Sequence, residues 1–175
     1  MILPLAEELM SLQATYEPIL SNPLDRVERI AERRDWTFDR PSNEEVLMAV
    51  GGGWCDLSLS LNWRDDLESL LVGCSYELKV PEKRREEMAK LVALINAQLI
   101  HGHFDFWEQE GSLIFRHALL LAGAAEANDA QCEGLIRLAV DTCQRYYPAV
   151  QFVIWAGHTA AQALDSALLE TLGEA

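Results

Sequence analysis

The stretch CDLSLSLNW, residues 55–63, decides the fold class of this chain. Its positions alternate between apolar and polar, so that Cys55, Leu57, Leu59, Leu61 and Trp63 interleave with Asp56, Ser58, Ser60 and Asn62. Because successive side chains of a β-strand point to opposite faces, this alternation predicts a strand with one buried and one wet face. Such strands are typical of antiparallel sheets, since parallel sheets are covered on both faces.

The same alternation in shorter runs predicts further strands on both sides of this one. We expect them at residues 36–38, 46–50, 70–78, 103–108 and 112–121. The last two are joined through Gly111 and should form a hairpin.

Helical spacing of apolar residues appears before and between these strands. Asn22 supplies an N-cap, Pro23 occupies the first helical position, and the apolar period continues to about Asp35. A second helix begins at Pro81, and we expect Gly102 just past its end, where glycine readily adopts a left-handed conformation.

The last helical region begins at Asn128, which forms a capping-box pattern with Gln131. Pro148 lies inside this region, and a proline within a helix costs about 3 kcal/mol. We therefore expect a kink or a fresh helix start near Tyr147. The element order is α-β-β-β-β-α-β-β-α, with residues 36–38 as an additional short strand. Helices and strands in blocks predict an α+β fold with helices packed on one sheet face.

Composition and charge restrict the partners and the location of this protein. The net charge is −14, with 14 Lys and Arg against 28 Asp and Glu, which argues against binding nucleic acid or anionic membranes. No apolar run reaches the length of a membrane span, and residues 1–22 carry only acidic charges, unlike a secretory signal. The four cysteines show no CxxC spacing, so we expect reduced thiols in a cytoplasmic protein.

The chain reads as one domain, residues 23–172, preceded by an N-terminal arm, residues 1–22. No repeat or linker divides the domain. The arm contains an apolar cluster that is a candidate protein-binding element: Leu3, Leu5, Leu9 and Met10. It could be a frayed tail, could dock on its own domain, or could exchange with a second subunit; its hydrophobicity favours docking.

A possible zinc site is formed by residues that lie close in sequence: His101, His103, Asp105 and His117. The hairpin register argues against it. If apolar residues pair across a loop of two or four residues, Phe104 faces His117 and Asp105 lies across from Arg116. His103 and Asp105 then point to the opposite face from His117, so we expect no metal.

No set of catalytic residues is recognisable either. There is no GxSxG elbow, and Gly51–Gly53 joins two strands instead of leading into a helix as a phosphate loop would. We therefore expect no catalytic residue and no cofactor. Trp107, which this register places across from Ile114 on the face away from the core, is a candidate anchor for a partner or a second subunit. Alternatively, the N-terminal arm covers it.

The block from Asn96 to Arg116 resembles the bacterial YbjN family through Asn96, Gly102, Phe104, Gly111, Phe115 and Arg116. The run from Tyr147-Pro148-Ala149 through Trp155-Ala156-Gly157 to Ala160 and Ala163 is similar to that family's C-terminal helix signature. The resemblance covers Pro23 to Leu169. It implies a type III secretion chaperone-like fold, α-β-β-β-α-β-β-α, often dimeric, and the label "putative bacterial sensory transduction regulator". It brings no catalytic residues.

We therefore expect a non-catalytic protein-binding regulator or chaperone-like adaptor that acts as a homodimer. We expect it to bind protein, and neither nucleic acid nor membranes. Two alternatives stay open. One is a small-molecule sensor or enzyme with a pocket between sheet and helices, and the other is a dedicated type III secretion chaperone.

Overall fold

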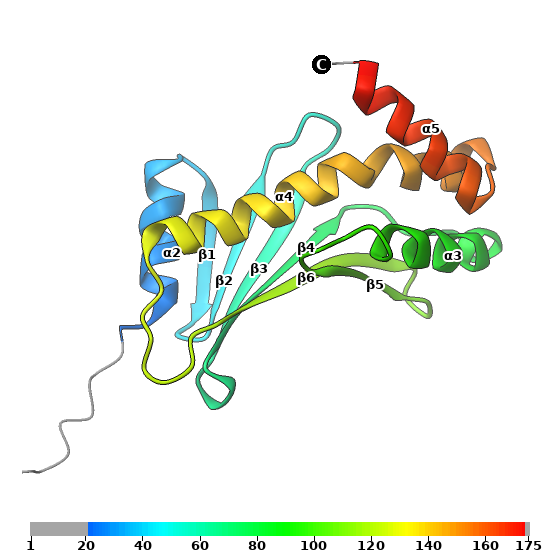
Figure 1. Cartoon of the computed structure of the whole chain (residues 1–175). Coiled ribbons are helices and arrows are strands. Elements are labelled where there is room, and N and C mark those ends of the chain that lie inside the picture. The colour runs from blue at the N-terminus through cyan, green and yellow to red at the C-terminus, as the bar shows by residue number, and fades with distance from the viewer. Residues whose placement is uncertain (1–20, 174–175) are drawn as a thin grey trace, which may run out of the picture.

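A six-stranded antiparallel sheet forms the centre of the computed structural model, which describes residues 21–173 (Figure 1). Its strands are β1 (Thr37–Ser42), β2 (Glu45–Val50), β3 (Leu57–Arg64), β4 (Ser69–Tyr76), β5 (His103–Trp107) and β6 (Ser112–Leu120). Their order in the sheet is β1-β2-β3-β4-β6-β5, so β1 and β5 are the two edges. The predicted α+β class, with an antiparallel sheet, is confirmed.

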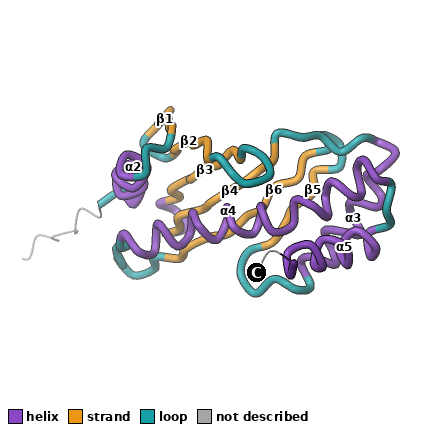
Figure 2. Tube along the Cα trace, turned by 90° about the horizontal axis from the view of Figure 1, so that it is seen from above, coloured by secondary structure: helices purple, strands orange, loops and turns teal. Residues whose placement is uncertain are grey.

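The helices lie on one side of this sheet (Figure 1). They are α2 (Pro23–Arg33), α3 (Arg85–Asn96), α4 (Asp129–Gln151) and α5 (Ala160–Gly173). Figure 2 shows the long α4 crossing the sheet, where it contacts β4 and β6, while α3 and α5 lie side by side near β5. In the described range, none of the helices combines the length and apolar character that crossing a membrane requires.

The core lies between the helices and the sheet. As predicted, the alternate apolar residues of β3 face it, and Leu57, Leu59 and Leu61 are at most 2% exposed. Burying one such side chain stabilises the fold by about 1.5–3 kcal/mol. In the part of the core beneath α3 and α4, the ring of Phe104 packs edge-on against the ring of Phe115, with ring centroids 5.5 Å apart.

Gly102 does not cap the second helix, so that prediction is wrong. The helix α3 ends at Asn96, and Gly102 lies immediately before β5 with a φ of +70°. A Cβ at this position would overlap the ring of Phe115 and lie 2.8 Å from the carbonyl oxygen of Arg116. Glycine is required here because the chain passes close to β6 in a left-handed conformation.

Pro148 neither breaks α4 nor starts a new helix near Tyr147, since α4 continues to Gln151. The residues from Tyr146 to Val150 are all buried, and this burial offsets the proline's cost of about 3 kcal/mol. The interruption comes later, in a π-helical turn (Phe152–Ala156) that ends at Gly157 with a φ of +73°. The predicted C-terminal helical region is therefore divided into two helices, α4 and α5, after Gln151 and not near Tyr147.

The predicted register of the last hairpin is wrong by two residues. Phe104 pairs with Phe115, where His117 was expected, and Trp107 pairs with Ser112, where Ile114 was expected. A shift of two residues keeps every side chain on its predicted face, because side chains alternate with a period of two. The face assignment of Trp107 is therefore unaffected.

Candidate functional site

The sheet face opposite the helices is left uncovered by the described residues, and we call it the open face (Figure 1). Cross-strand pairing places on it the polar or small alternate residues of the central strands together with several apolar side chains. Its members on β2 to β6 include Leu47, Ser60, Asn62, Arg64, Leu71, Gly73, His103, Asp105, Trp107, Ile114, Arg116, Ala118 and Leu120.

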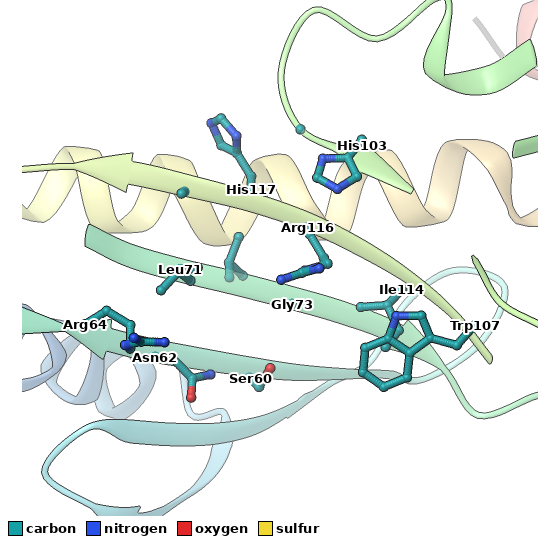
Figure 3. A pocket seen from close by; sticks show the side chains of 13 residues that line it. Ser60, Asn62, Arg64, Leu71, Gly73, His103, Trp107, Ile114, Arg116 and His117 are labelled. Atoms are coloured by element: carbon teal, nitrogen blue, oxygen red, sulfur yellow. The ribbon is translucent and has the colours of Figure 1, made fainter. Parts of the chain in front are cut away.

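A hollow of about 650 Å³ opens in the middle of this face (Figure 3). Small residues form its floor, since Gly73 on β4 pairs with Ser60 on β3 and with Arg116 on β6. A Cβ added to Gly73 would lie 2.9 Å from the hydroxyl oxygen of Ser60, so any larger residue would fill the space. Arg64 stands at one end of the hollow and Trp107 at the other (Figure 3).

The side chains that line the hollow on the open face include those of Arg64, Arg116 and His103 but no carboxylate. The nearest acids pair with the arginines from outside it: Arg64 binds Asp66 with N···O distances of 2.8 and 2.7 Å, and Arg116 donates to Asp105 at 3.2 Å. These pairs are exposed and contribute little to stability. In a chain of net charge −14, the hollow is therefore a place where cationic groups gather.

Both carboxylates respond to these contacts. The hydrogen bond from Arg64 lowers the pKa of Asp66. The pKa of Asp105 is lowered first by the hydrogen bond from the Trp107 indole, 2.9 Å long, and then by Arg116. Asp105 thus holds the indole nitrogen and the guanidinium in place while the ring of Trp107 stays 44% exposed.

Exposed apolar side chains extend beyond the hollow along the same face. Leu120 is 67% exposed on β6 and Leu47 is 39% exposed on β2. Aromatic and arginine side chains surrounded by apolar surface are typical of the residues that dominate protein–protein binding. The open face therefore has the chemistry of a protein-binding surface.

The predicted protein-binding residues are partly placed by the structure. Trp107 and Ile114 both lie on the open face and line the hollow, although Trp107 pairs with Ser112 and Ile114 pairs with Asp105. The arm residues lie outside the described residues: Leu3, Leu5, Leu9 and Met10. Sequence reasoning missed Arg64 and Leu120. Leu120 occupies an alternate polar-face position of the predicted strand 112–121, whereas Arg64 follows the predicted strand 55–63 and is the last residue of β3 in the structure.

The histidines occupy different sides of the hairpin. His103 lies on the open face, whereas His117 pairs with Val72 on the other face and packs near His101, with ring centroids 5.9 Å apart. Burial lowers the pKa of His117, and the neighbouring His101 and His103 lower it further. Among residues 21–173, no three His, Cys, Asp or Glu side chains are grouped so that they could hold a metal ion.

The cysteine thiols are poorly placed for nucleophilic chemistry. Cys74, Cys132 and Cys143 are buried, and burial raises the pKa of the Cys132 and Cys143 thiols. Cys55 is half-buried, and burial raises its pKa too. Because the thiolate is the reactive form, these environments disfavour a catalytic cysteine.

Most of the residues that carry the resemblance between Asn96 and Arg116 serve the fold. The Asn96 side chain accepts from the N–H of Phe104 at 2.8 Å and donates to its carbonyl at 2.9 Å. Gly111, with a φ of +66°, accepts from the N–H of Val80 at 2.8 Å, and a Cβ there would lie 2.7 Å from the Val80 carbonyl oxygen. Arg116 differs because it is exposed and lines the hollow.

Comparison with known proteins identifies the family. Residues 23–152 match the model of the YbjN family, described as "Putative bacterial sensory transduction regulator". This range is shorter than the Pro23–Leu169 stretch that carries the resemblance in sequence. None of the curated proteins matches the chain.

Two solved structures are similar to this fold. The "crystal structure of YbjN, a putative transcription regulator from E. coli" is 13% identical, with a TM-score of 0.51, over 69% of this chain and 85% of that chain. A chain of the ExsC-ExsE complex is 18% identical, with a TM-score of 0.52, over 73% of this chain and 94% of that chain. At these identities the likeness concerns the fold alone. Since the family match spans most of the sequence, the chain belongs to the YbjN family.

Proposed function

We propose that this protein is a cytoplasmic, non-catalytic regulator or chaperone-like adaptor that binds a protein partner on its open face. The observation that carries the proposal is the hollow of about 650 Å³, with the exposed ring of Trp107 at one end and Arg116 beside it. An amphipathic ring held by its indole nitrogen offers a rigid contact at low entropic cost.

The relatives support the same proposal. The family label is that of a regulator, and a chain with a similar fold occurs in the ExsC-ExsE complex. The helices on one face of the sheet already enclose the hydrophobic core, and the other face is bare. A partner can therefore bind the bare face without any rearrangement of the core.

The alternative of a sensor or enzyme requires a pocket between sheet and helices. That space contains buried apolar side chains from both layers, among them Val72, Phe115 and Ile136. The hollow opens on the other side of the sheet, where an extended partner is a better fit than an enclosed small molecule. The raised thiol pKa values also favour a role without catalysis.

We also propose that the protein acts as a homodimer. Its described surface carries apolar side chains outside the open face, including Ile100, which is 91% exposed. Burial of such side chains against a second copy would contribute favourable free energy to a dimer.

The partner-binding proposal is tested by comparing two tryptophan variants in affinity capture with quantitative mass spectrometry. Trp107→Ala removes the exposed ring from the open face, and Trp155→Ala removes one that is 66% exposed in the π-helical turn. We expect a partner retained by the wild type and by Trp155→Ala to be depleted about tenfold or more with Trp107→Ala. A partner retained equally by both variants contradicts binding on the open face, and so does recovery of none.

A further inference from the structure

We propose that residues 1–20 of the same chain bind in the hollow and cover the open face until a partner displaces them. The inference rests on the proposed function, because it concerns how access to that face is controlled. Three features support it: the position at which the chain enters the fold, the chemistry of the two surfaces, and the covalent tether.

The described chain begins beside the end of the hollow where Arg64 lies. The Asn22 side chain donates to the carbonyl of Asn43, in the turn between β1 and β2, at 2.6 Å. The carbonyl of the next residue, Glu44, accepts from the N–H of Trp63 at 3.0 Å. Trp63 immediately precedes Arg64, which lines the hollow. The point of entry is therefore linked to the rim of the hollow by two hydrogen bonds.

The length of the segment is sufficient to cross the sheet. Five strand spacings of about 4.8 Å separate β1 from β5, or roughly 24 Å. Twenty residues in an extended conformation reach about 66 Å. Residues 1–20 can therefore extend from Asn22 past Arg64 to Trp107 with chain to spare.

The chemistry of the segment complements that of the hollow. Residues 1–20 contain Glu7, Glu8 and Glu17 and neither lysine nor arginine. Their acids stand among apolar residues that include Leu3, Leu5, Leu9 and Met10. The hollow offers the guanidinium groups of Arg64 and Arg116, each of which also bonds to a carboxylate at the rim, Asp66 or Asp105. It offers apolar contacts as well, from Leu71, Ile114 and Trp107.

The covalent tether favours this occupant over a free peptide of the same composition. A short flexible connection gives an effective concentration in the millimolar range, so even a contact with a weak intrinsic affinity is well populated. A partner that binds the same face must compete with the tethered segment, which lowers the partner's apparent affinity. The segment thus acts as an intramolecular regulator of the face.

The test uses the full chain with the photo-crosslinker benzoylphenylalanine in place of Leu9. We expect crosslinks from this position to peptides containing residues 58–64 or 103–118. The control carries the same crosslinker in place of Leu94, which is 40% exposed on α3 and outside the open face. Crosslinks from position 9 to the helical face, or none above the control, would overturn the proposal.

Charge reversal tests the recognition itself. Glu7→Lys with Glu8→Lys, or Arg64→Glu with Arg116→Glu, should each reduce the crosslink yield about tenfold, because like charges then face each other. All four substitutions together should restore the yield. An unchanged yield in either double variant, or no recovery in the combined one, contradicts the proposal. Circular dichroism of each variant establishes that it is folded.

Isotope mixing identifies the chain that supplies the segment. A mixture of ¹⁵N-labelled and unlabelled chains should give crosslinks within one chain only, and mixed-isotope crosslinks would show exchange with a second copy and overturn binding in cis. The outcomes also separate this inference from the proposed function. Crosslinks in cis without any captured partner contradict only the function, and a partner dependent on Trp107 without these crosslinks contradicts only the inference.

Discussion

At the scale of single residues, two side chains of the same block have different roles. Asn96 is half-buried and pairs with the backbone of Phe104, as a neighbouring strand would. The N–H and C=O of Phe104, which point outward from the edge strand β5, are therefore hydrogen-bonded within the chain. Exposed edges promote association between sheets, and covering them is one way in which proteins avoid it. Arg116, by contrast, is exposed on the open face, where its guanidinium bonds to Asp105 at 3.2 Å.

Replacing Asn96 by leucine should lower the free energy of unfolding by about 2 kcal/mol or more, because two backbone groups of Phe104 lose their partner in a buried setting. Urea denaturation followed by circular dichroism measures this. Asn62→Leu is the matched control, since Asn62 lies on the open face and its side chain makes no hydrogen bond within residues 21–173. An equal effect of the two substitutions would contradict the role assigned to Asn96.

At the scale of elements, periodicity predicted which segments are strands and which faces they bury. It could not fix the register of the β5–β6 hairpin, because registers two residues apart place the same side chains in the core. The observed register depends on contacts distant in sequence. Gly111 packs against the backbone of Val80, and the ring of Phe104 lies between Phe115 and Tyr146.

Pro148 illustrates the same limit for helices. Helix propensity treats the proline as a break, and only tertiary packing reveals that Tyr146–Val150 is buried without interruption. A local cost of about 3 kcal/mol is smaller than the gain from burying several large side chains, each worth about 1.5–3 kcal/mol. The sequence alone does not show which side chains pack around Pro148, and this packing decides whether burial outweighs the cost of the proline.

The packing of α2 on α4 gives a prediction about pH. Asp129, at the start of α4, accepts from Arg33 at 3.1 Å and from Arg26 at 3.2 Å, and these bonds lower its pKa from the ordinary 3.8. A carboxyl group with a lowered pKa stabilises the fold above its unfolded-state pKa. That contribution disappears as the pH falls through the folded-state pKa.

Asp129→Asn should therefore cause a small fall in Tm at pH 6, where the carboxylate is ionised in both states. The difference from the wild type should shrink below about pH 4. Differential scanning calorimetry across this range measures it at low salt, because screening weakens exposed pairs. Asp141→Asn is the control on the same helix, since Asp141 makes no ion pair in the part of the chain that the structure describes. A difference that grows toward acid would contradict the sign.

At the scale of the whole molecule, the hollow is the feature that the sequence could not reveal. Its floor joins Ser60, Gly73 and Arg116 from three strands, and Trp107 comes from a fourth. These meet only because β6 pairs with β4 and leaves β5 at the edge. Trp107 and Ile114 could be assigned to the open face from alternation, but the cationic lining appears only when the strand order is known.

The oligomeric state is the prediction that concerns the whole surface. We expect a light-scattering mass of twice the 19.7 kDa chain, or 39.4 kDa. Ile100, in the connection between α3 and β5, should contribute, because a symmetric interface buries each of its residues twice. Ile100→Asp should therefore shift the mass toward 19.7 kDa at micromolar concentration.

Trp107→Ala separates the two surfaces in the same measurement. If the open face is reserved for a partner and for residues 1–20, this variant keeps the mass of a dimer. A monomeric mass for Trp107→Ala alone would make the open face the dimer interface, and it would contradict the assignment of that face to a partner. A monomeric mass for the wild type would contradict the homodimer itself. It would not contradict the binding of a partner in the hollow, because the hollow and its cationic lining belong to one chain.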